Sequence, residues 1–112
     1  DAVLIRTGWM SRFDGDMDAP QPGIGIEAAT LLADADVVAI GSDNSAVEAM
    51  PFDGGTFMPV HIELLVRRGI YLVEHLTLDE LAASGRHEFL FVCSPLRTVG
   101  ASGSPVNPLA IC

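Results

Sequence analysis

Short apolar runs bounded by turn residues alternate along the chain with segments in which apolar residues recur at helical spacing. Five such runs predict strands, at residues 3–5, 37–40, 70–73, 89–93 and 109–112. A helix is expected from about Ile24 to Asp34, a second from Pro59 to Gly69 with Ile62, Leu65 and Val66 on its apolar face, and a short third from Thr77 to Gly85. This alternation is typical of an α/β domain, and we expect one mixed sheet with flanking helices.

The size and composition of the chain favour one folded domain. With 112 residues, of which 49% are apolar, it can bury roughly two-thirds of its unfolded surface. The 15 acidic side chains outnumber six basic ones, all Arg, and the net charge is −9. Because nucleic acids and anionic membranes are bound through Lys and Arg, neither is expected as a partner. No apolar stretch approaches the roughly 20 residues that cross a bilayer.

Two cysteines, Cys93 within a predicted strand and Cys112 at the last position, do not form a disulfide framework. We therefore expect a reducing, cytoplasmic location, and we interpret Cys93 as a core thiol because no basic residue adjoins it.

His61 and Glu74 are the strongest candidates for a metal-binding or acid–base site. His61 lies at the start of the predicted second helix, where the helix dipole disfavours a second ring proton and keeps the imidazole neutral. Glu74 follows the strand at residues 70–73, and sites in α/β sheets gather at the carboxyl ends of strands. The two side chains are thus expected to converge there. The alternative is an ordinary structural hydrogen bond between them.

Other candidates have simpler interpretations. Since adjacent strand residues point to opposite faces, only one of Glu74 and His75 can share a cavity with His61. His87 and Glu88 are interpreted as a solvated pair at a strand edge.

Asp43 follows a strand and a turn, a place that suits either a functional carboxylate or a turn residue. Trp9 and Phe13 could line an apolar pocket or fill the core. The glycine-rich segments lack the spacing of phosphate-binding loops, and no Lys is present to complete one.

The order and spacing of several segments are similar to those of a known family. The segments are Asp-Ala-Val-Leu-Ile-Arg-Thr-Gly-Trp at residues 1–9, Pro-Gly-Ile at 22–24, Val-Ala-Ile-Gly-Ser-Asp at 38–43, Pro-Val-His at 59–61, Ile-Tyr-Leu-Val-Glu-His-Leu at 70–76, Pro-Leu at 95–96 and Gly-Ser-Pro-Val at 103–106. Together they resemble the later half of the cyclase family of metal-dependent hydrolases, which includes the bacterial kynurenine formamidases and the isatin hydrolases.

The resemblance implies a swivelling β/β/α fold and a divalent metal, zinc or manganese, that activates water to cleave the C–N bond of a cyclic amide, an N-formyl amide or a similar small substrate. His61 and Glu74 match the family's later histidine and glutamate, so both are expected to bind metal and to take part in catalysis. The family also implies a homo-oligomer.

One family motif has no counterpart in the chain. The family's His-x-Gly-Thr-His-x-Asp lies in its earlier half, whereas no two histidines of this chain are four apart. Residues 1–112 are therefore expected to be the C-terminal portion of one cyclase-like hydrolase domain, whose N-terminal half would be a partner supplied by a separate, cleaved or longer chain. The alternative function is a non-catalytic assembly module without a complete metal site.

Overall fold

A parallel sheet forms the centre of the larger of two compact units, Asp1–Glu80 and Leu81–Cys112. The computed structural model describes residues 1–112, apart from the side chain of Asp53. The sheet holds β1 (Ala2–Ile5), β2 (Ala39–Ser42) and β3 (Tyr71–Val73) in that order. Sequential order is what helical crossovers between neighbouring parallel strands produce. The predicted α/β class is therefore confirmed.

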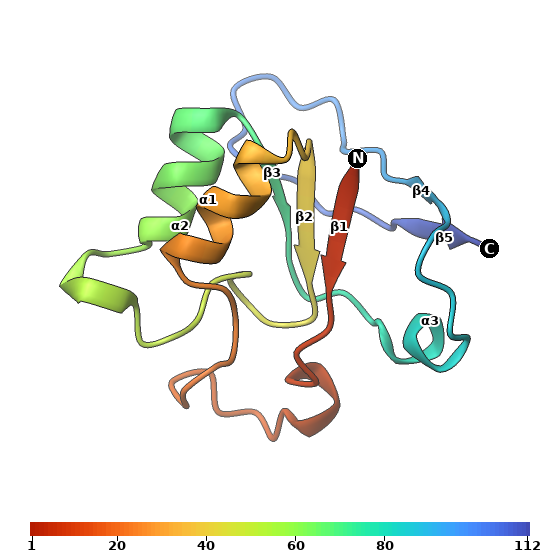
Figure 1. The fold of residues 1–112 in the computed structure, drawn as a ribbon, viewed down its shortest axis with the longest axis horizontal. Helices are drawn as coiled ribbons and strands as arrows, with labels where there is room; N and C mark the ends of the chain where they lie inside the picture. The colour runs from red at the N-terminus through yellow and green to blue at the C-terminus, as the bar shows by residue number, and fades with distance from the viewer. The chain divides into compact units, whose positions relative to one another are not determined.

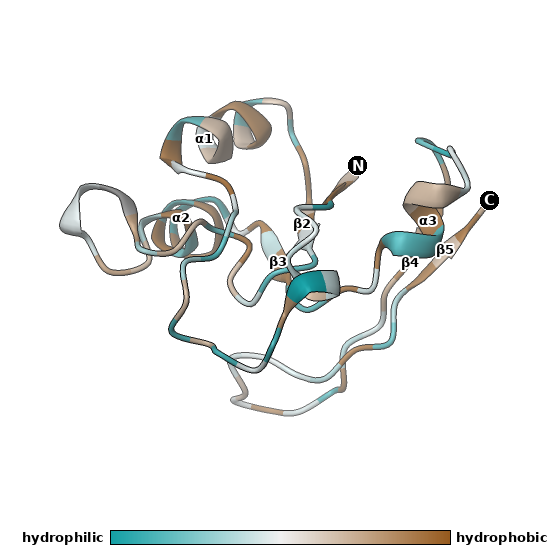
Figure 2. Cartoon of the chain, turned by 90° about the horizontal axis from the view of Figure 1, so that it is seen from below, coloured by the Kyte–Doolittle hydropathy of each residue, from teal (hydrophilic) through white to brown (hydrophobic). Residues whose placement is uncertain are grey.

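Two helical segments cover one face of this sheet (Figures 1 and 2). They are α1 (Ile26–Asp34) and the segment that begins with α2 (Pro59–His61) and continues as η3 (Ile62–Arg68). The strand register brings Val3, Ile40 and Leu72 into one row. These side chains pack with the buried residues Ala29, Ala33, Val37, Val47, Val60, Leu64 and Ile70. Helices and sheet thus share a single apolar core.

The second helical segment differs from its prediction in both winding and face. Pro59 begins it and Gly69, at φ 69°, ends it as expected, but η3 is a π-helix. The buried residues are Val60 and Leu64, whereas Leu65 on the predicted face is 40% exposed. The cause is the wider turn, in which both Gly69 and Ile70 donate backbone hydrogen bonds to the carbonyl of Leu64.

The smaller unit contains an antiparallel pair, β4 (Leu90–Val92) and β5 (Leu109–Ile111), in which Phe91 is opposite Ala110. Helix α3 (Asp79–Ala83) spans the boundary between the units, and short 3₁₀ turns occur at η1 (Met10–Arg12) and η2 (Asp53–Gly55).

The single mixed sheet expected from the sequence is corrected by this structure. Across the described residues the parallel and antiparallel strands form two separate sheets, because β4 and β5 hydrogen-bond to each other and not to β1–β3. Within the same residues, no helix combines the length and the apolar character needed to cross a membrane.

Candidate functional site

The carboxyl ends of β1, β2 and β3 meet at one edge of the sheet, the lower edge in Figure 1. Thr7 follows β1, Asp43 follows β2 and Glu74 follows β3 directly. The helix that runs back across the sheet toward β3 begins at the same edge and carries His61 in its first turn. This βαβ geometry gathers polar side chains that lie far apart in the sequence.

His61 and Glu74 converge at this edge. The Nε2 atom of His61 lies 3.3 Å from Oε1 of Glu74, and their side chains are 18% and 36% exposed respectively. The juxtaposition predicted from the sequence is therefore present, with the imidazole mostly sheltered and the carboxylate open to solvent.

A third side chain, that of Glu48, joins His61 and Glu74, and we call these three residues the His61 cluster. The sequence pattern had not singled out Glu48. Its side chain is 1% exposed, and its Oε1 lies 2.6 Å from Nδ1 of His61. The same carboxylate accepts hydrogen bonds from the backbone N–H groups of Val60 (3.1 Å) and His61 (3.3 Å). A signal for it exists in the sequence: Glu48 is the lone charge among Ala46, Val47 and Ala49, and a carboxylate in such a setting needs buried partners.

Two carboxylates set the protonation preference of His61. The interaction with Glu74 raises the pKa of His61; burial opposes this, and the hydrogen bond with Glu48 adds to the rise. The helix dipole was expected to lower the pKa of His61, but the structure shows a raised pKa, because two adjacent negative charges outweigh the partial charge of a helix end.

Asp43 has structural partners at the same edge. Its carboxylate accepts hydrogen bonds from the N–H (2.7 Å) and hydroxyl (2.6 Å) of Thr7 and from the N–H of Gly8 (2.7 Å). Burial by itself raises the pKa of Asp43, but the bonds from Thr7 and Gly8 outweigh it and leave the pKa lowered. Asp43 therefore acts as a turn anchor, the simpler of its two interpretations.

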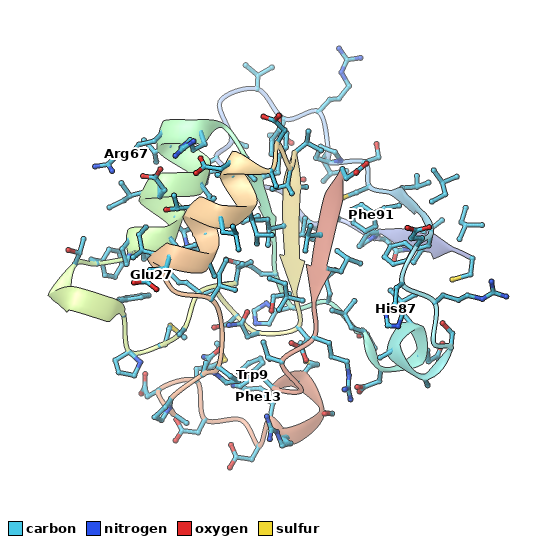
Figure 3. The ribbon with its side chains drawn as sticks, viewed as in Figure 1. Trp9, Phe13, Glu27, Arg67, His87 and Phe91 are labelled. Carbon is cyan, nitrogen blue, oxygen red and sulfur yellow. The ribbon has the colours of Figure 1, made fainter. Side chains whose placement is uncertain are left out.

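The aromatic candidates fill space beside the site. Trp9 is buried, and its ring centroid lies 4.6 Å from that of Phe13. Both residues are labelled in Figure 3. The imidazole of His75 lies 5.9 Å from the Trp9 ring. His75 thus packs with Trp9 while Glu74 meets His61, in keeping with the expectation that only one of the two adjacent residues faces the site.

The remaining candidates lie in the smaller unit. His87 and Glu88 are exposed, as a solvated pair would be. Cys93 is partly buried and Cys112 exposed, and both thiols are free.

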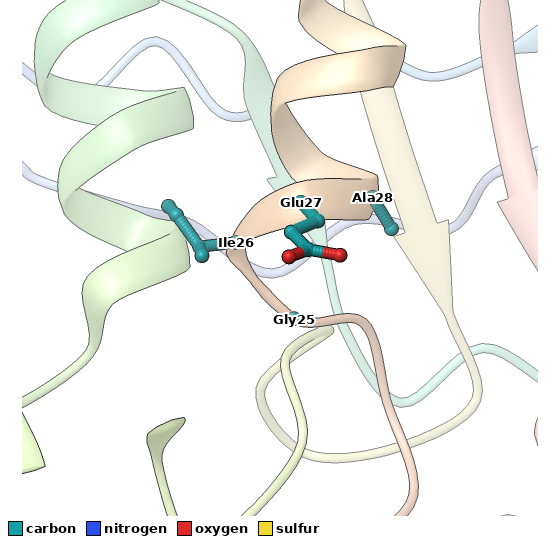
Figure 4. Close-up of a pocket in the computed structure, with 4 residues that line it drawn as sticks. All are labelled: Gly25, Ile26, Glu27 and Ala28. Carbon is teal, nitrogen blue, oxygen red and sulfur yellow. The ribbon is translucent and has the colours of Figure 1, made fainter. Parts of the chain in front are cut away.

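A pocket at the start of α1 is lined by Gly25, Ile26, Glu27 and Ala28 (Figure 4). None of the residues of the His61 cluster lines it, so it is distinct from the candidate site.

The part of the chain that the structure describes contains no group of three or more His, Cys, Asp or Glu side chains arranged to hold a metal ion. The His61–Glu74 pair offers one nitrogen and one carboxylate as potential ligands.

Comparison with known proteins finds one family that the chain is similar to. The Cyclase family model matches residues 1–49. Cyclase-like protein 2 of Arabidopsis thaliana is 34% identical over 113 aligned residues, which cover 97% of this chain. The crystal structure of a novel cyclase superimposes on all of the chain with a TM-score of 0.86 and 35% identity. Over its whole length the chain is thus similar to proteins of the cyclase family.

The chain covers 39% of the Arabidopsis relative and 40% of the solved cyclase. The family-model match ends just after Glu48, so it includes β1, α1 and β2, whereas His61 and Glu74 lie beyond it.

Proposed function

We propose that this chain is the C-terminal part of a cyclase-family, metal-dependent hydrolase that cleaves a C–N bond in a cyclic amide, an N-formyl amide or a similar small substrate. The observation that carries the proposal is the approach of His61 Nε2 to Glu74 Oε1 at the carboxyl edge of the sheet, with a second carboxylate on the other ring nitrogen.

The donor atoms of this pair fit zinc, and imidazole nitrogen and carboxylate oxygen also suit manganese. Two ligands at zinc bond lengths and tetrahedral angles lie about 3.3 Å apart, and Nε2 and Oε1 are separated by 3.3 Å. Metal-binding histidines commonly donate their other N–H to a carboxylate, the place that Glu48 occupies. The residues present therefore support two ligands of such a site.

Two ligands are fewer than the three that proteins usually supply to catalytic zinc. We propose that the other donors come from the portion of the relatives' length that this chain does not span, so that the complementary N-terminal half is a partner. Similarity to the family also leads us to propose a homo-oligomer, and the two free thiols suit a reducing, cytoplasmic location.

A bound zinc or manganese would lower the pKa of water and polarise the substrate carbonyl. The contribution of this chain is to orient the reacting groups. His61 is anchored by Glu48 and presents Nε2. In this proposal the second oxygen of the more exposed Glu74 carboxylate would take a proton from attacking water and return it to the leaving nitrogen.

The test uses this chain alone and mixed with the remaining segment of the Arabidopsis relative. Zinc and manganese uptake at pH 8 is measured by equilibrium dialysis, and hydrolysis is measured with an N-formyl aryl amide and with a lactam. We expect His61→Ala and Glu74→Gln to lower metal uptake at least tenfold and to abolish hydrolysis by the mixture. The matched controls His87→Ala and Glu80→Gln change exposed residues and should alter neither. Uptake and hydrolysis that persist in both site variants would overturn the proposal.

A second candidate, a non-catalytic assembly module, is favoured by apolar side chains left open to solvent. Leu31 on α1 and Val66 on η3 are 71% and 75% exposed, although the two helices are neighbours. If the mixture assembles into a defined complex but neither binds metal through His61 nor hydrolyses either amide, this second function is preferred.

A further inference from the structure

The buried carboxylate of Glu48 touches both the backbone and the ring of His61. We propose that Glu48 is a positioning residue that fixes the tautomer of His61, with the ring proton on Nδ1 and the lone pair on Nε2, the atom that faces Glu74. This inference rests on the proposed function, in which Nε2 is the atom used for metal binding.

The hydrogen bonds define the tautomer. Oε1 of Glu48 lies 2.6 Å from Nδ1 of His61, and the remaining donors around the carboxylate are the N–H groups of Val60 and His61. An ionised carboxylate only accepts hydrogen bonds, so Nδ1 must be the donor. Glu74 also presents a carboxylate to the ring, but Nε2 lies 3.3 Å from its Oε1, so in the neutral ring the single proton stays at the shorter contact on Nδ1. Nε2 is then unprotonated, which is the form that binds a metal.

The structure leaves Glu48 little freedom to turn away. Its backbone carbonyl accepts a hydrogen bond from Nδ2 of Asn44 at 3.1 Å, and Ile24 and Glu48 form a β-bridge. Gly23 approaches so closely that an added Cβ would lie 2.4 Å from the carbonyl carbon of Glu48. The carboxylate is therefore held in a fixed place between this backbone and the helix start.

A purely structural role would be to cap the helix. The bonds from the N–H groups of Val60 and His61 satisfy that role, since they occupy donors that a helix start leaves free. The contact with Nδ1 is shorter than both and adds nothing to capping. It is this third contact that selects one tautomer.

Glu48→Gln separates the two roles. The amide has one accepting oxygen and an NH₂ group, so it either keeps the Nδ1–H bond without the negative charge or turns NH₂ toward Nδ1. In both arrangements the preference for a proton on Nδ1 weakens. Exchange of a tautomer-fixing carboxylate for an amide is known to leave a catalytic histidine in the wrong tautomer. Loss of such a partner typically costs 10–100-fold in metal affinity.

The experiment uses the full chain labelled with ¹⁵N-histidine and free of metal, in buffer alkaline enough for the ring to be neutral. Long-range ¹H–¹⁵N correlations identify the protonated nitrogen. We expect His61 to carry its proton on Nδ1 in the wild type and to show an increased Nε2–H population in Glu48→Gln, with zinc affinity lowered 10–100-fold. Glu63→Gln makes the same chemical change in the helical segment that carries His61. The Glu63 carboxylate pairs with Arg67 and Arg68, so this control should leave the tautomer of His61 unchanged.

The wild-type spectrum alone can overturn the inference, whether or not the buried variant folds: a proton on Nε2 contradicts it. An unchanged tautomer in folded Glu48→Gln contradicts it as well. The proposed function fails separately. If Nδ1 is protonated as expected but His61→Ala has no effect on metal uptake or hydrolysis, Glu48 still positions the ring and the assigned metal role is wrong.

Discussion

Asp43 and Thr7 join the ends of two neighbouring strands, with Oδ1 of Asp43 accepting both the backbone N–H and the hydroxyl of Thr7. The Thr7 hydroxyl in turn accepts the N–H of Trp9 at 3.1 Å. One carboxylate therefore sets the path by which the chain leaves β1 and brings Trp9 into the core.

Replacement of Asp43 by Asn should destabilise the fold. The amide has one accepting oxygen for three donors and places NH₂ against the N–H of Gly8 or the donors of Thr7. We expect a loss of about 2 kcal/mol in the free energy of unfolding, measured by urea denaturation. The matched control is Asp79→Asn, which removes an exposed ion pair with Arg6 and should cost less than about 1 kcal/mol. Equal losses in the two variants would contradict the anchoring role.

The contribution of Asp43 should depend on pH. Its pKa is lowered from the ordinary value of 3.8, so ionised Asp43 stabilises the folded state fully above that value and the stabilisation disappears as the pH falls through the lower folded-state pKa. The difference in unfolding free energy between the wild type and Asp43→Asn should therefore be constant at neutral pH and shrink in acid. Urea denaturation from pH 7 to pH 2.5 measures it. A difference that stays constant to the acid limit would show that the charge of Asp43 has no part in the stabilisation.

Gly23 is required by close packing against the site segment. A Cβ at this position would lie 2.5 Å from both the carbonyl oxygen of Glu48 and the nitrogen of Ala49, which are backbone atoms that cannot rotate away. We expect Gly23→Ala to destabilise the chain by about 1–3 kcal/mol and to change the NMR signals of the His61 ring. Gly103→Ala adds its Cβ in open space and should stay within about 0.5 kcal/mol of wild type. Unchanged NMR signals of the His61 ring in Gly23→Ala would contradict the predicted link between packing at Gly23 and the position of His61.

Substitution of two adjacent leucines in η3 can show which face of the helix is buried. Leu64 is fully buried whereas Leu65 is 40% exposed, the reverse of the sequence prediction for Leu65. Leu64→Ala should cost about 2–5 kcal/mol, and Leu65→Ala less than about 1 kcal/mol. Thermal and urea denaturation of the two variants decide between the faces, because the predicted pattern requires the larger loss at Leu65.

The fold was largely predictable because strand and helix signals are local. The apolar runs, Pro59 and Gly69 mark their elements directly. The sequence could not show the π-helical winding of η3, which depends on how the Leu64 carbonyl is shared, or the separation into two sheets, which depends on long-range pairing.

The candidate site was predictable in part. His61 and Glu74 could be paired because the βαβ topology brings a helix start and a strand end to one edge. Glu48 lies in an irregular segment without periodicity, and only the folded chain shows its carboxylate beneath the helix start. The raised pKa of His61 was likewise inaccessible, since it depends on the positions of both carboxylates.

The shared carboxylate of Glu48 has a consequence for local opening of the molecule. The N–H of Val60 and the Nδ1 of His61 are held by the same group, so the first turn cannot fray without releasing the imidazole. The rate of hydrogen exchange at the Val60 amide therefore reports how often the first turn opens and Nε2 of His61 leaves its position in the site. Any ligand that binds through Nε2 should slow exchange at Val60, even though it does not touch that residue.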